Sequence, residues 1–225
     1  MKKIDYVLLV ILIISISIFA LITALENNAY NLDYYMESYS KNNVYEITNK
    51  SYDELETISK KIIEVIKGNA DANELEPYFN QKEIHHMRDV QGLFNIAKIL
   101  KLISAILIII LIFYFLKKEK ANIMGKWIGL GLAVNYFILL ILFILVTTDF
   151  NRYFIKFHEL FFSNDLWILD PSKDLLIQLM PEAFFTDIII KILIRFIVYI
   201  LIAQFIGYIF YKKGLYNIPS FKKTK

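Results

Sequence analysis

Residues 6–25 read YVLLVILIISISIFALITAL, and this run decides the class of protein to which the chain belongs. Only small polar side chains, such as Ser15 and Ser17, interrupt it. A helix of about twenty apolar residues spans the hydrocarbon core of a bilayer. The run is longer than the apolar part of a usual signal peptide, and no clean small-x-small cleavage site precedes a polar start. We therefore predict a retained membrane anchor.

The rest of the chain is apolar enough to cross a membrane again. The sequence has 225 residues, of which 57% are hydrophobic, and a soluble domain of this length would not be so apolar throughout. Three further apolar runs follow the first. We predict a mainly α-helical membrane protein whose four transmembrane helices occupy residues 1–25, 95–116, 127–147 and 188–211.

Lysine residues indicate how these helices are oriented. They cluster at the N-terminus, in the connection at 117–126 and in the tail at 212–225. The positive-inside rule places all three regions, and therefore both termini, in the cytoplasm. The segments 26–94 and 148–187 then lie together on the outer side, where we expect them to form a small extracytoplasmic cap.

The cap is predicted to combine helices with short strands. Residues 30–35 alternate partly between apolar and polar side chains, and residues 44–48 allow a second strand. Ser51 and Glu54 have the spacing of a capping box and introduce an amphipathic helix, which Gly68 ends. A further helix is expected over residues 83–90, leading into the second span.

The histidines gather on the predicted outer side, near the ends of spans; they are His85, His86 and His158. On a helix, His158 shares a face with Phe154, Phe161 and Phe162 at spacings of three and four. An apolar setting disfavours the charged imidazolium, so His158 is expected to stay neutral and available as a base. The same segment also fits an interfacial helix in which the histidine is incidental.

Charged side chains near the histidines are candidates for supporting roles. Asp89 follows His86 by three residues and His85 by four, so its carboxylate is within reach of either imidazole and can fix a tautomer. A solvated cap with ordinary surface charges is the alternative. The other charged neighbours are expected to be structural more than chemical; they are Glu83, Arg88 and Glu159.

Lys191 and Arg195 lie one turn apart near the outer end of the last span. Ionisable residues within a span are costly and often functional. A functional role for the two residues would be to receive a lipid phosphate or stabilise an oxyanion. The structural alternative, which is favoured, is that they extend toward the outer headgroups or that Arg195 pairs with a buried acid. Asp187 precedes Lys191 by four residues and is an available partner for it.

Other catalytic chemistries find less support. The chain has no cysteine, which excludes disulfides, thiolate metal sites and a cysteine nucleophile. A metal site built from His86, His158 and carboxylates lacks the HExxH spacing of a helical zinc site. Ser163 lies close to His158, but no G-x-S-x-G sequence surrounds it.

Two stretches resemble one bacterial enzyme family. Glu83 followed by His86-Met87-Arg88-Asp89-Val90 resembles the E-x-x-H-M-x-D-V signature of the lipoprotein intramolecular transacylases, called Lit. A second set of residues is similar to that family in the same order: Asp149-Phe150, Phe157-His158, Phe161-Phe162, Trp167, Asp170-Pro171, Pro181-Glu182 and Phe184-Phe185. His85 is an additional histidine beside the family position.

The resemblance implies an acyltransferase of the bacterial cell membrane with its active site on the outer face. Its substrates would be diacylglyceryl-modified lipoproteins among membrane lipids, with no nucleic acid, cofactor or metal involved. One acyl chain would move from the diacylglyceryl group to the α-amino group of the N-terminal cysteine, giving the lyso-form. The resemblance implies His86 and His158 as the essential pair. A metal-dependent membrane hydrolase and a non-enzymatic polytopic membrane subunit are the alternatives.

Overall fold

The computed structural model describes residues 2–216 and divides the chain into two compact units. The first, called the span unit, comprises Met1–Ala24, Leu100–Ile141 and Ile194–Lys225. The second, called the histidine unit, comprises Leu25–Ile99 and Leu142–Leu193 and contains all three histidines.

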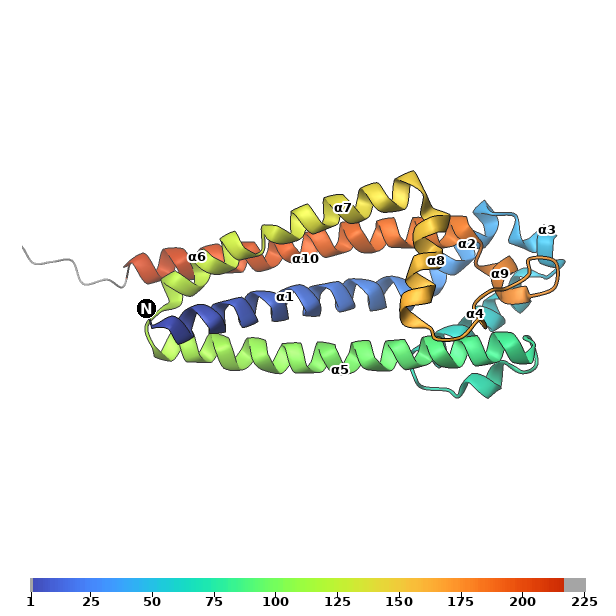
Figure 1. The fold of residues 1–225 in the computed structure, drawn as a ribbon, viewed down its shortest axis with the longest axis horizontal. Helices are drawn as coiled ribbons and strands as arrows, with labels where there is room; N and C mark the ends of the chain where they lie inside the picture. Colours follow the sequence, from blue (N-terminus) through green and yellow to red (C-terminus); the bar gives the residue numbers. More distant parts are fainter. Residues whose placement is uncertain (1, 217–225) are drawn as a thin grey trace, which may run out of the picture. The chain divides into compact units, whose positions relative to one another are not determined.

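Within the described residues, the regular secondary structure is helical throughout (Figure 1). The elements are α1 (Lys3–Ala29), α2 (Leu32–Lys41), α3 (Val44–Thr48), α4 (Tyr52–Ile66), the 3₁₀ helix η1 (Ala72–Leu75), α5 (Gln81–Lys117), α6 (Ala121–Gly131), α7 (Val134–Thr148), α8 (Phe150–Phe161), α9 (Leu175–Leu179) and α10 (Glu182–Tyr216).

Four helical stretches in the described part of the chain are long and apolar enough to cross a membrane: α1, α5, α6 with α7, and α10. This confirms the predicted number of apolar helices. Two of them begin well before the predicted spans, because α5 starts at Gln81 and α10 at Glu182. Each therefore carries a polar first section that belongs to the histidine unit.

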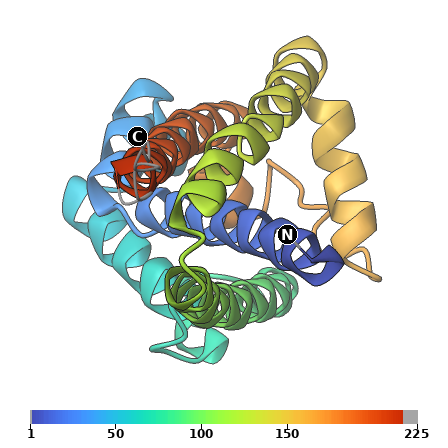
Figure 2. The ribbon, with the colours of Figure 1, turned by 90° about the vertical axis from the view of Figure 1, so that its left-hand side faces the viewer.

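Hydrogen bonds join the helices of the span unit. Figure 2 views these helices from one end. The buried Asn135 on α7 donates to Ser17 Oγ on α1 over 2.9 Å. Near the start of α1, the buried Asp5 forms a 2.7 Å ion pair with Lys120 and accepts from the Tyr114 hydroxyl over 3.1 Å. Apolar surroundings strengthen such contacts, which fix how the helices align.

Glycines allow two helix pairs in the span unit to approach closely. A Cβ atom on Gly131 would lie 2.3 Å from Ile13 Cδ1, and one on Gly125 would lie 2.3 Å from the Gly207 carbonyl oxygen. Small residues serve this purpose in membrane helices. A Cβ atom on Gly129 would have no such neighbour within 4 Å, so this glycine does not serve a close approach.

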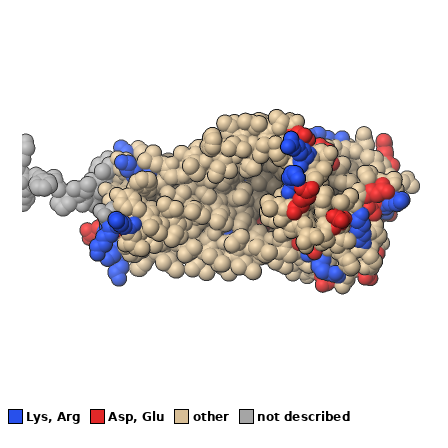
Figure 3. Space-filling model, viewed as in Figure 1, with Lys and Arg blue, Asp and Glu red and all other residues tan. Residues whose placement is uncertain are grey.

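Charge is distributed differently in the two units. The visible flank of the span unit is free of charged side chains over most of its helices, and the charged side chains at one end are mostly basic (Figure 3). The visible face of the histidine unit carries acidic and basic side chains together (Figure 3). An uncharged flank suits contact with lipid, whereas mixed charges require water or headgroups.

The predicted strands are absent from the described residues, and that part of the prediction is wrong. Residues 32–41 form α2 and residues 44–48 form α3. The Asn31 side chain accepts from Tyr34 N and caps α2. Tyr35 and Tyr39, one turn apart, are both buried, so burial of one helical face overrides the strand preference of the tyrosines.

The predicted amphipathic helix is present as α4. Ser51 and Glu54 form a complete capping box at its start. Its apolar face is buried, at Leu55, Ile58, Ile62, Ile63 and Ile66. Gly68 follows the helix with a φ of +69°, a conformation that glycine adopts without strain. Both ends of this helix were thus readable from local sequence.

Candidate active site

Two imidazoles lie side by side in the histidine unit. His86 is on the first section of α5 and His158 is in the last turn of α8. Their ring centroids are 6.0 Å apart, with 38° between the ring planes. Both residues are buried, with 7% of His86 and 6% of His158 exposed. Two buried polar rings in contact distance of one another are the main feature of this unit.

Local sequence sets the position of His158 on α8. The Asp149 side chain caps the helix by accepting from Arg152 N over 3.1 Å. Phe162 ends the helix, and its N–H donates to the carbonyl oxygen of His158 over 2.8 Å. The chain leaves the helix directly after the histidine's turn, which brings Phe162 and Trp167 back against the imidazole.

Aromatic rings surround the His158 imidazole. The Phe154 ring centroid is 4.1 Å away and that of Trp167 is 4.9 Å away, nearly stacked at 29°. Phe162 lies 5.5 Å away. Phe161 was predicted to join this group, but it is 49% exposed and its ring contacts Phe157 instead. That prediction is wrong because the helix ends at Phe161 and the following residue turns inward.

The hydrogen bond of His158 identifies its neutral tautomer. Nδ1 lies 2.7 Å from the Phe154 carbonyl oxygen, which can only accept, so Nδ1 carries the proton and Nε2 keeps a lone pair. Burial lowers the pKa of His158 from its ordinary value, while the bond to Phe154 acts in the opposite direction. The ring is therefore neutral near pH 7, with Nε2 available as a base.

His86 has an unsatisfied buried nitrogen. The Phe162 ring packs edge-on against the imidazole at 5.2 Å. Its Nδ1 atom is buried, and no described residue of the chain hydrogen-bonds to it. Buried polar atoms without a partner are rare and are often found at functional sites or beside an unseen ligand. Nδ1 is thus able to bind a substrate atom or water without breaking an existing bond.

Glu83, one turn before His86, holds the start of α5. Its Oε2 accepts from Asn80 N over 2.8 Å, and Asn80 Oδ1 accepts in return from Glu83 N over 3.1 Å. Its Oε1 accepts from Leu176 N in α9 over 2.7 Å. Asn80 also donates to Asp174, the residue before α9, over 2.8 Å. One buried carboxylate therefore caps two helices and joins them.

The other predicted supporting residues have partners elsewhere. Asp89 accepts from the Asn164 side chain over 2.9 Å. The exposed Arg88 donates to Asn73 over 2.6 Å, and the exposed Glu159 pairs with Lys156 over 2.6 Å. Arg195 is half-buried on α10 within the span unit. The structure thus brings Glu83 and Asp89 near the start of α5 and directs Arg88 and Glu159 to solvent.

Sequence reasoning missed the roles of Asn164 and Asp174. Asn164 holds the Asp89 carboxylate and also accepts from Leu166 N over 3.0 Å in its own turn. Asp174 is buried and accepts from Asp170 N over 2.7 Å. The only local signal was the general preference of Asn and Asp for turns, which does not identify a partner far away in the chain.

The described residues include no group of three or more His, Asp or Glu side chains placed to hold a metal ion. The carboxylates nearest in sequence to His86 accept hydrogen bonds from amides, as described above for Glu83 and Asp89. The exposed Ser163 follows Phe162 and has no hydrogen bond to either imidazole. The polar geometry of the site is therefore that of two imidazoles.

A sequence profile described as lipoprotein intramolecular transacylase Lit matches residues 10–185, which is most of the chain. The chain belongs to the Lit family. It is an acyltransferase of lipoproteins and an integral membrane protein. The resemblance of the His86 and His158 stretches to Lit is thereby confirmed at the level of the family.

Solved Lit structures share the fold of this chain. The membrane-integral Lit from Bacillus cereus is 22% identical, with a TM-score of 0.81 over 96% of this chain and 98% of that chain. Versions of it with one histidine replaced by arginine or by alanine both match with a TM-score of 0.76, over 95% of this chain and 92% and 94% of theirs, at 22% and 21% identity. No curated protein sequence matches the chain.

Proposed function

We propose that His86 and His158 are the catalytic pair for acyl transfer from the diacylglyceryl group to the α-amino group of a lipoprotein's N-terminal cysteine. The observation that supports this most strongly is the 6.0 Å separation of two buried imidazoles, one with a free Nε2 lone pair and the other with an unpartnered Nδ1. The nucleophile belongs to the substrate, so the enzyme needs no cysteine or activated serine.

His158 is the base in this proposal. As the neutral α-amino nitrogen of the substrate attacks the ester carbonyl carbon, His158 Nε2 accepts one of the two protons on that nitrogen. The Phe154 carbonyl, which already accepts from Nδ1, stabilises the imidazolium that forms. Attack within one molecule gains from proximity, because both reacting groups are on the same lipidated cysteine.

His86 acts on the carbonyl and the leaving group. From its position in the pair it donates a hydrogen bond to the developing oxyanion. The bond between the carbonyl carbon and the glycerol oxygen then breaks, and the proton taken from the amine is delivered to that oxygen. The aromatic rings of Phe154, Phe162 and Trp167 limit the entry of water, which would otherwise hydrolyse the ester.

The proposed position of this site is the outer surface of the membrane. Lysine clusters near 117–126 and at both ends of the chain support a cytoplasmic location for those regions. The segments 26–94 and 148–187, which carry the histidines, then face outward. Diacylglyceryl-modified lipoproteins are anchored in membranes by the acyl chains on which the enzyme acts, so substrate and site lie at the same depth.

Mass spectrometry of one lipoprotein's N-terminal lipopeptide tests the reaction. In a bacterium that lacks N-terminal acylation, introducing this gene should convert the diacylglyceryl peptide into an isobaric product with one acyl chain on the amino group and one on glycerol. An unchanged peptide, with the protein detected in the membrane, would count against the proposal. A product lighter by one acyl chain would indicate hydrolysis.

The titration of His158 tests the assignment of the base. Burial lowers its pKa, so His158 should remain neutral as the pH falls through the ordinary histidine value of about 6.5. Since the unfolded chain takes up this proton first, the contribution of His158 to folding stability is complete above about pH 6.5 and declines in more acidic solution. NMR of ¹³C-histidine in the full-length protein, assigned with His→Gln variants, measures the titration.

Trp167 provides the matched comparison for this measurement. The Trp167→Ala variant removes the ring that stacks on His158 at 4.9 Å, so water reaches the imidazole and its titration should shift upward. A titration of His158 at or above about 6.5 in the unaltered protein would contradict the proposed neutral base.

A further inference from the structure

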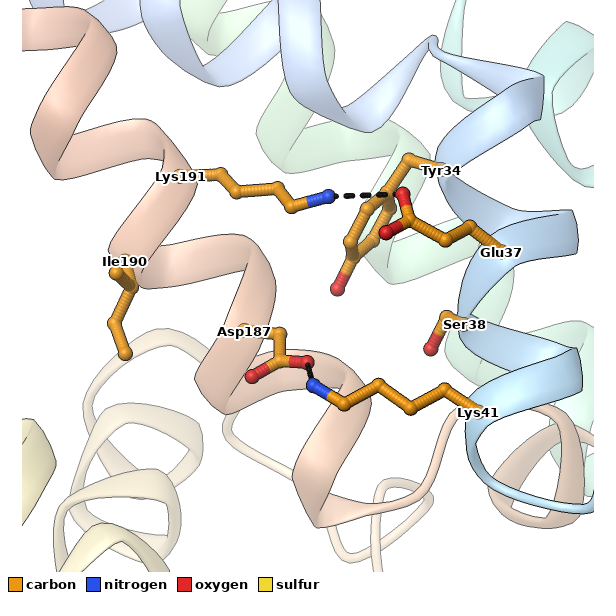
Figure 4. Close-up of a pocket in the computed structure, with 7 residues that line it drawn as sticks. All are labelled: Tyr34, Glu37, Ser38, Lys41, Asp187, Ile190 and Lys191. Atoms are coloured by element: carbon orange, nitrogen blue, oxygen red, sulfur yellow. Dashed lines mark hydrogen bonds and ion pairs between the residues drawn. The ribbon is translucent and has the colours of Figure 1, made fainter.

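A charged pocket lies in the histidine unit, apart from the imidazole pair. It has a volume of about 190 Å³ and is formed by α2 and the first section of α10 (Figure 4). Its lining residues are Tyr34, Glu37, Ser38 and Lys41 from α2, and Asp187, Ile190 and Lys191 from α10. Acidic and basic groups are present in equal number.

The charges of this pocket pair between the two helices. Lys191 Nζ is 3.2 Å from Glu37 Oε2, and Lys41 pairs with Asp187. Within each helix, an acidic residue also precedes a basic residue by four positions, and this spacing alone would favour ion pairs within the helix. The predicted pair of Asp187 with Lys191 is therefore wrong, because α2 supplies closer partners for both residues.

These ion pairs are open to exchange. Lys41, Glu37 and Lys191 side chains are 63%, 71% and 43% exposed. Exposed pairs contribute little to stability, so a ligand that offers new partners can replace them at low cost. Lys191 Nζ also lies 4.6 Å from the centroid of the Tyr34 ring, which orients the ammonium group over the pocket (Figure 4).

We propose that this pocket binds the headgroup of a phospholipid that carries both a phosphate and a primary ammonium, of the phosphoethanolamine type. The phosphate would contact Lys41 and Lys191, and the ammonium would contact Glu37 and Asp187. An anionic headgroup would leave two carboxylates without a cation. A quaternary ammonium cannot donate to them and prefers a cage of several aromatic rings, whereas the lining contains only Tyr34.

The course of α10 favours an intact lipid over a soluble phosphoethanolamine. Ile190 is the apolar member of the lining, and helical spacing continues its face through Ile194 and Val198. Ile194 is 58% exposed and Val198 is 46% exposed. The same helix then continues along a candidate membrane span. The helix that lines the pocket therefore also carries exposed apolar side chains, which suit acyl chains.

The proposal does not depend on the roles of the histidines, because it concerns binding. The pocket nevertheless has a route of contacts to them. The Tyr34 hydroxyl donates to the Phe184 carbonyl oxygen over 2.6 Å. From Phe184, ring contacts run through Phe185 and Phe154 to His158. Tyr34 is thus hydrogen-bonded to the first turn of α10. A lipid that displaces Lys191 from the Tyr34 ring would change the contacts of this tyrosine.

Native mass spectrometry of the full-length protein tests this proposal. The protein is exchanged into nanodiscs of dioleoyl-phosphatidylethanolamine, -phosphatidylcholine or -phosphatidylglycerol, and the lipids retained after release are counted. The unaltered protein should retain the ethanolamine lipid in preference to both others. Lys191→Gln should weaken this retention about tenfold, the size expected for losing one charged contact. Lys173→Gln is the matched control, since Lys173 is an exposed, ion-paired lysine of the same unit outside the pocket.

The carboxylates give a second, independent readout. A Glu37→Gln, Asp187→Asn double variant keeps both lysines and loses both acids, so its preference should change from the ethanolamine lipid to the anionic glycerol lipid. Equal retention of all three lipids by the unaltered protein would overturn the proposal, as would a double variant with unchanged preference. Soluble glycerophosphoethanolamine that binds as tightly as the intact lipid would also overturn it, in favour of a soluble ligand.

Discussion

Replacing His86 or His158 with alanine should reduce formation of the lyso-form product by at least about a hundredfold, the lower range of a general acid–base contribution. In His158→Ala the base is lost together with its Nδ1 hydrogen bond to Phe154. In His86→Ala the group beside it is lost from a packed aromatic site. The lipopeptide assay described above measures both, normalised to the amount of protein in the membrane.

Two further variants make this prediction specific. Residues that act as one unit are not additive, so the His86→Ala, His158→Ala double variant should be no less active than either single variant. His85→Ala is the matched control, because His85 is the adjacent histidine on α5 but is exposed. Near-normal product from both single variants, or a loss with His85→Ala as large as that with His86→Ala, would contradict the proposed pair.

Replacing Glu83 with alanine should reduce the free energy of unfolding by about 3 kcal/mol, because two hydrogen bonds to the carboxylate, one buried and one part-buried, are lost at about 1.5 kcal/mol each. The change leaves Leu176 N without its acceptor and removes half of the reciprocal cap with Asn80. Because His86 is one turn further along α5, activity should fall as well. Thermal unfolding of the full-length protein in detergent measures the stability.

The control for the Glu83→Ala variant is the loss of a carboxylate on the surface. Glu159→Ala removes an exposed ion pair with Lys156 and should change stability by less than about 1 kcal/mol. Glu83→Gln keeps one oxygen acceptor and loses the charge, so it should lie between Glu83→Ala and the unaltered protein. A Glu83→Ala protein as stable as the Glu159→Ala protein would show that the carboxylate does not join α5 to α9.

Local sequence was sufficient where one chain segment determines its own structure. The four apolar helices follow from their length and composition, and α4 follows from its cap, its apolar period and Gly68. Local sequence was insufficient for α2 and α3, where tyrosine and β-branched residues suggested strands. Those segments are too short for propensity to decide, and burial of Tyr35 and Tyr39 selected the helix.

In the candidate site, too, some features could be predicted from local sequence and others required the tertiary structure. The proposal of His86 and His158 as a pair came from resemblance to a family, while the distance between their rings is known only from the fold. The Asp187–Lys191 pair was a sound local expectation, but α2 presents Glu37 and Lys41 to the same charges. Similarly, nothing in the sequence near Asp89 identifies Asn164 as its partner, since the two are far apart along the chain.

The continuous course of α5 makes the helix that carries His86 longer than a membrane span requires. The helix has 37 residues, so it is about 55 Å long, whereas the hydrocarbon core measures about 30 Å. Helices adjust to a thinner or thicker membrane by tilting. His86 is near the N-terminus of α5, while His158 is on α8, a separate helix that begins after Asp149. The α5 helix exceeds the hydrocarbon core by about 25 Å, so it is long enough to cross the core and still carry His86 beyond it.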